Sequence, residues 1–86
     1  MTPEQKKNFD LSATTYSLVE GLLPSDEAAI IYGYIFEHNE WGLGLETLVD
    51  VILTRNIVVS AAQKEVIRTA MDAMNLDRSQ EDIQVR

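Results

Sequence analysis

The chain has 86 residues, of which 45% are hydrophobic and none is cysteine. This length supports one modest core, and the composition is that of a folded domain rather than a disordered tail. The lack of cysteine excludes a disulfide framework and a thiolate metal site. No apolar run approaches the roughly 20 residues that cross a bilayer. The first ten residues are polar and predict no signal peptide, so we expect a cytoplasmic protein without a membrane segment.

Fourteen acidic residues against seven basic ones give a formal net charge of −7. Such a field repels nucleic acid and anionic lipid, and it accelerates encounter with a basic partner. Acidity also keeps a small protein soluble whatever its function, so charge alone leaves both interpretations open. We expect no direct binding to nucleic acid or to a membrane.

The first segment has the pattern of an amphipathic helix. Thr2 is a helix cap, Pro3 suits the first helical position, and Gln5 completes a capping box. Apolar residues then recur every three or four positions. Pro24 pushes the residue before it out of the helical region, so we predict a helix over about 3–22.

The second segment is predicted to be a helix over 25–39. Asp26 and Glu27 stand in its first turn, where the helix dipole favours negative charge. It is apolar on nearly every side, which is typical of the central helix of a bundle. Gly33 costs about 1 kcal/mol relative to alanine in mid-helix, so we expect another helix to cross closely there.

A third helix is predicted over 41–55, after a tight corner at Asn39 and Glu40. Leucine and β-branched side chains share one of its faces, and burial of each is worth about 1.5–3 kcal/mol. Glu46 and Asp50 lie one turn apart on another face. The helix therefore has a core to join and also presents an acidic stripe.

The segment 55–59 is predicted to be an extended linker, because a lone short strand has no evident pairing partner. Ser60 and Gln63 form a second capping box and open a helix over 60–75. Residues 77–86 are mostly polar, and we expect a loose tail there.

The fold class that follows is all-α. We predict a small four-helix bundle in a single domain over 1–76, with a flexible polar tail after it. Asn56 and Asn75 are expected to end their helices in the left-handed conformation.

Candidate catalytic and cofactor motifs are weak. His38 is the only histidine, and near a helix C-terminus a histidine more often bonds free carbonyls than acts as a base or ligand. Gly42 and Gly44 lack the spacing and the lysine of a phosphate loop. Ser25 lacks the Asp-Ser-Leu context that an acyl carrier protein needs. We therefore predict no enzyme activity, no metal and no cofactor.

Aromatic residues gather around the corner. Trp41 is the only tryptophan, and in a small bundle such a residue usually belongs to the core. Tyr32, Tyr34 and Phe36 compete for the same interior, so they cannot all be buried on one short helix. Surplus aromatics beside acidic side chains suit a protein-binding surface, where aromatic anchors sit inside a polar rim.

The stretch from His38 to Leu48, HNEWGLGLETL, resembles the H-x-E-W-G-L-A-L-E-x-L segment of small helical immunity proteins. These are the Maf-type immunity proteins and their relatives in contact-dependent inhibition systems, which bind and neutralise secreted bacterial toxins. The similarity extends loosely to the preceding helix and to the helix that follows Ser60. Gly44 stands where the family commonly has alanine, a departure expected to loosen the start of the helix.

The resemblance implies that the partner is the C-terminal domain of a cognate toxin, expected to be a nuclease with a basic cleft. An acidic protein with aromatic anchors suits such a cleft through charge complementarity and steered association. The free protein is expected to be a monomer or a weak dimer. Glu40, Trp41 and Glu46 can instead cap the third helix and pin the corner, and for Trp41 we favour that structural role. The candidate toxin-facing residues are Tyr34, Glu37, Glu40, Trp41, Glu46 and Asp50.

Two other classes of function stay open. An acidic adaptor or nucleic-acid mimic would bind several basic proteins with similar affinity, whereas an immunity protein selects one. A small enzyme or enzyme subunit would have an internal cleft and show activity without a partner. Selectivity for one basic protein therefore distinguishes an immunity protein from an adaptor or mimic, and activity without a partner identifies an enzyme.

Overall fold

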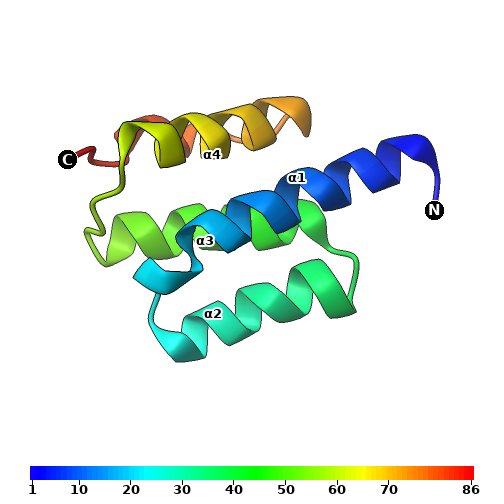
Figure 1. Ribbon diagram of the computed structural model, residues 1–86, viewed down its shortest axis with the longest axis horizontal. Helices are drawn as coiled ribbons and strands as arrows, with labels where there is room; N and C mark the ends of the chain where they lie inside the picture. The colour runs from blue at the N-terminus through cyan, green and yellow to red at the C-terminus, as the bar shows by residue number, and fades with distance from the viewer.

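The computed structural model describes all of residues 1–86 and consists of four α-helices with three short helical turns. Figure 1 shows α1 and α3 lying between α2 and α4. The predicted all-α four-helix bundle is confirmed. The elements in chain order are α1 (Pro3–Val19), the 3-10 turn η1 (Glu20–Leu22), α2 (Ser25–Tyr32), the π-helical turn η2 (Gly33–Glu37), α3 (Trp41–Thr54), α4 (Ala61–Ala73) and the 3-10 turn η3 (Ser79–Asp82).

The central helix is α3, which packs against α1, α2, η2, α4 and η3. Its buried face carries Leu45, Leu48 and Val49, all fully removed from solvent. The expectation that the second helix is central is wrong. Although α2 is apolar on most sides, it lies at the edge of the bundle, and Ile30 and Tyr32 remain 54% and 47% exposed.

Both predicted capping boxes are present. The Thr2 hydroxyl accepts from the Gln5 N–H at 3.1 Å, and the Gln5 side chain accepts from the Thr2 N–H at 2.8 Å. Ser60 and Gln63 make the same reciprocal pair at 3.0 and 2.8 Å. Each box satisfies two N–H groups that a helix start leaves free, so the sequence defines where α1 and α4 begin.

Three asparagines end helical segments in the left-handed conformation. Asn39, Asn56 and Asn75 have φ angles of 55°, 53° and 55°. After α4 the Leu76 N–H donates to the Met71 carbonyl oxygen at 2.9 Å, which closes the helix end. The predicted roles of Asn56 and Asn75 are confirmed.

Gly44 marks a close approach between α3 and η2. A Cβ atom placed there would lie 2.7 Å from Ile35 Cγ1 and 3.5 Å from Tyr34 Cβ. The close crossing predicted at Gly33 is wrong, because a Cβ there would meet only Glu37 Oε1, at 3.3 Å on the same helical segment. Gly44 therefore allows α3 to pack closely against Ile35 of η2. The resemblance had predicted only that this glycine loosens the start of the helix.

We expect Gly44→Ala to lower the free energy of unfolding by about 1 kcal/mol, because overpacking outweighs the gain in helix propensity. Gly42→Ala is the matched control. The added Cβ would meet nothing nearer than Leu76 Cδ2 at 3.5 Å. Gly42→Ala should therefore raise the free energy of unfolding by up to about 1 kcal/mol. Urea denaturation of both variants measures the difference, and equal stabilisation would contradict the close packing at Gly44.

The segment after α4 is packed rather than loose, which contradicts the predicted flexible tail. In this segment, Gln80 and Ile83 are only 0% and 3% exposed, and Ile83 joins the core. The Lys64 ammonium on α4 donates to the carbonyl oxygens of Glu81 and Ile83, at 2.9 and 2.8 Å. A buried isoleucine and a cation bridging two carbonyls hold η3 against the bundle.

The end of the chain also pairs with the linker between α3 and α4. The Val59 N–H donates to the Gln84 carbonyl oxygen, and the Arg86 N–H donates to the Val59 carbonyl oxygen, each at 3.0 Å. This isolated parallel bridge joins Val59 to Val85. The linker is extended, as predicted, and Val59 is fully buried; its pairing partner, which the sequence analysis did not find, is the C-terminal segment.

Candidate functional site

The four carboxylates predicted to face a partner are all exposed, and none forms an ion pair. Glu37, Glu40, Glu46 and Asp50 lie on η2, on the corner and on α3. They therefore carry uncompensated negative charge. The carboxylates that do form ion pairs are Asp10 with Lys6, Glu27 with Arg55, Glu65 and Asp72 with Arg68, and Glu81 with Arg78.

The basic residues are segregated along the chain. No lysine or arginine occurs between Lys7 and Arg55, a stretch that contains most of α1 and all of α2, η2 and α3. Of the basic residues, only Lys6 and Arg55 form ion pairs with carboxylates of those elements. This separation is visible in the sequence, although the net charge alone does not reveal it.

Glu46 and Asp50 line a surface groove between α3 and the segment after α4. The groove has a volume of about 480 Å³. We call it the acidic groove. Asp77 from the C-terminal segment adds a third carboxylate, which has no ion-pair partner either. The residues that line it are Leu43, Glu46, Thr47, Asp50, Leu53, Asp77 and Ser79.

The acidic groove follows from the pattern of α3. The i, i+4 spacing puts Glu46 and Asp50 on one side of the helix while the leucine face enters the core. Leu43, one turn earlier, is 44% exposed and gives the groove an apolar end. Asp77 was missed because residues 77–86 were predicted to be loose, and no local pattern signals that they fold back onto α3.

Trp41 belongs to an aromatic cluster. Its ring packs edge-on against Phe9 at a centroid distance of 6.5 Å, and Phe9 contacts Phe36 at 5.6 Å. Tyr16 and Tyr32 both contact Phe36, at 5.9 and 4.6 Å. Trp41 is partly buried, and its contacts support the structural role favoured for it from the sequence.

A second groove lies between η1 and α2, and we call it the tyrosine groove. It has a volume of about 630 Å³ and is lined by Tyr16, Tyr32, Glu20 and Glu37, among others. The Tyr16 hydroxyl donates to the Ala28 carbonyl oxygen at 3.3 Å. Burial, and after it the charge of Glu20, raises the pKa of Tyr16 above the ordinary tyrosine value. Of the predicted residues, only Glu37 lines this groove.

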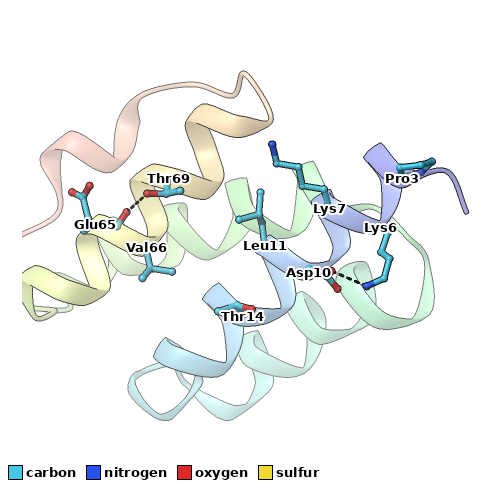
Figure 2. A pocket seen from close by; sticks show the side chains of 9 residues that line it. All are labelled: Pro3, Lys6, Lys7, Asp10, Leu11, Thr14, Glu65, Val66 and Thr69. Carbon is cyan, nitrogen blue, oxygen red and sulfur yellow. Dashed lines mark hydrogen bonds and ion pairs between the residues drawn. The ribbon is translucent and has the colours of Figure 1, made fainter.

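A third groove lies between α1 and α4, away from the predicted residues, with a volume of about 640 Å³. Figure 2 shows Lys7 and Leu11 from α1 facing Val66 and Thr69 from α4, whereas Lys6 turns toward Asp10. Its two carboxylates are already paired, Asp10 with Lys6 and Glu65 with Arg68. It therefore offers no free negative charge to a basic partner.

The six predicted residues do not line one common groove. Glu46 and Asp50 belong to the acidic groove and Glu37 to the tyrosine groove. Glu40 is exposed at the corner, and Tyr34 is half-buried where η2 approaches Gly44.

Comparison of the chain with protein-family models, with curated proteins and with solved structures finds no match. What the fold establishes is the class of the protein, a small acidic four-helix bundle. None of its helices has both the length and the apolar character needed to cross a bilayer.

Proposed function

We propose that the chain is an immunity protein, which binds the C-terminal domain of a cognate bacterial toxin and so protects the cytoplasm of the producing cell. Two observations support this proposal. The stretch from His38 to Leu48 resembles the Maf-type immunity proteins. The carboxylates of Glu46, Asp50 and Asp77 line one groove without any ion-pair partner, which suits a basic surface.

The observation that carries the proposal is the acidic groove. A nuclease holds the phosphate backbone with lysine and arginine, so its cleft is basic. The three carboxylates of the acidic groove can pair with the lysines and arginines of such a cleft, and the exposed Leu43 beside them offers an apolar contact. Occlusion of the toxin's substrate site would follow from occupation of the cleft, and no chemistry by this chain is needed.

The alternative function is an acidic adaptor or nucleic-acid mimic, which the same segregated charge favours. The two differ in selectivity. A mimic relies on the overall field and binds basic proteins broadly, whereas an immunity protein relies on a shaped contact and binds one of them.

Co-expression with the product of the neighbouring upstream reading frame tests the proposal. The C-terminal region of that product should arrest growth when expressed alone, and this chain should restore growth and co-purify with it. As a selectivity control, an unrelated basic nuclease should not be neutralised. A harmless neighbour, or toxicity that this chain does not change, would contradict the immunity function, and neutralisation of both nucleases would favour the mimic.

A further inference from the structure

The tyrosine groove has the composition of a binding site that the proposed contact at the acidic groove does not use. Its volume of about 630 Å³ is within the range of roughly 300–1,000 Å³ typical of ligand sites. Part of its lining is apolar or small, from Leu23, Ala28 and Ala29. Glu20 and Glu37 contribute two carboxylates that form no ion pair, and no lysine or arginine lines the groove.

Tyr32 offers an aromatic face to this groove. One face of its ring stacks on Phe36, with the centroids 4.6 Å apart and the planes at 29°. The edge-on contact with Tyr16, at 6.0 Å, holds the ring from another side. The residue nevertheless remains 47% exposed and lines the groove, so these contacts hold the ring while part of it stays accessible to a ligand.

The two carboxylates flank the tyrosines. Glu20 lies close enough to the Tyr16 hydroxyl for its charge to contribute to the raised pKa of that tyrosine. Glu37 lies one turn after Gly33, and a Cβ at Gly33 would be only 3.3 Å from Glu37 Oε1. The missing side chain of Gly33 therefore gives Glu37 room to lie against the helix.

We propose that the tyrosine groove receives an arginine side chain of a basic protein partner, stacked on Tyr32 and paired with Glu20 or Glu37. Arginine fits better than lysine because its planar guanidinium stacks on an aromatic face and binds a carboxylate through two hydrogen bonds. The groove is larger than one side chain, so residues beside the arginine fit against Ala28 and Ala29.

Arginine binding at the tyrosine groove depends only on residues of this chain, so it can be tested without the toxin. Its use as a second contact with the toxin rests on the proposed function, because there the arginine would come from the toxin surface. The two ideas can fail separately, since a protein without a toxin partner can still bind an arginine peptide at this groove.

The test is an NMR titration at low salt with the blocked peptide Gly-Ser-Arg-Ser-Gly. We expect saturable shift changes at Tyr32, Ala28 and Ala29, and none with the matched peptide in which uncharged citrulline replaces arginine. Tyr32→Leu keeps an apolar contact on Phe36 but removes the aromatic face, and it should weaken binding about fivefold.

The double variant Glu20→Gln with Glu37→Gln should weaken binding about tenfold, and it changes only exposed side chains. Glu46→Gln with Asp50→Asn removes as much charge in the acidic groove and should leave peptide affinity unchanged. The inference is overturned if the peptide does not bind, if citrulline binds equally well, or if the shift changes map to the acidic groove. If the co-expression test fails and the peptide binds normally, the toxin is rejected as the partner, but the arginine-binding site in the tyrosine groove is retained.

Discussion

Under the proposed function, the variant Glu46→Lys with Asp50→Lys is expected to bind the cognate toxin at least about 100-fold more weakly than the native protein, a loss of about 2.7 kcal/mol. Each reversal replaces an attraction to the basic cleft with a repulsion, and like charges placed together across an interface cost several kcal/mol. Both residues are exposed and lack ion-pair partners, so the reversals remove no contact that stabilises the fold.

The measurement is association and dissociation kinetics at several salt concentrations. Electrostatic steering raises the association rate, and salt screens it over a Debye length of about 10 Å at 0.1 M. We therefore expect the native pair to associate more slowly as salt increases, and the variant to show little or no such dependence. Thermal unfolding of the variant checks that the bundle is intact.

The matched control is Glu4→Lys with Asp26→Lys, which changes the net charge by the same amount outside the acidic groove. Both residues are exposed in the first turns of α1 and α2 and form no ion pair. This control should retain most of the toxin affinity. If both double variants lose affinity equally, overall charge rather than the groove determines binding. Unchanged affinity and salt dependence in the first variant would exclude the acidic groove as the interface.

Much of the fold could be predicted because its signals are local. The capping boxes at Thr2 and Ser60 need only residues three positions apart, and both form. The left-handed ends at Asn56 and Asn75 depend on the conformational preference of a single residue. The acidic stripe of α3 followed from helical periodicity in the same way.

The features that sequence analysis missed depend on segments far apart in the chain. Nothing near Val59 indicates that its partner is Val85, and nothing near Asp77 indicates that it completes the acidic groove. The position of α2 at the edge was missed for a related reason. Apolar residues on every side suggest a central helix, but whether each side is covered depends on how neighbouring helices are arranged.

The tyrosine groove could have been anticipated only in part. The absence of basic residues between Lys7 and Arg55 is visible in the sequence. Bringing Glu20 beside Tyr32, however, requires the chain to reverse direction after η1, and the spacing of the two residues alone does not predict it.

Ile83→Ala tests whether the C-terminal segment is part of the core, and we expect it to lower the free energy of unfolding by about 2–4 kcal/mol. The side chain is 3% exposed and belongs to the main hydrophobic cluster. Truncation removes buried methyl groups and leaves a cavity, and a loss of this size is a large part of the stability of a small domain. The melting temperature should fall by roughly 8–30 °C.

Gln84→Ala is the control, because Gln84 is exposed and uses only its backbone oxygen to accept from Val59. It should change stability by no more than about 0.5 kcal/mol. Hydrogen exchange gives an independent measure: the amides of Val59 and Arg86 should be protected in the native protein and exchange faster in Ile83→Ala. If Ile83→Ala were as stable as Gln84→Ala, with both amides unprotected in the native protein, the segment would be the loose tail that its polar composition suggests. Asp77 would then not be held in the acidic groove, and only the carboxylates of α3 would be available to a partner.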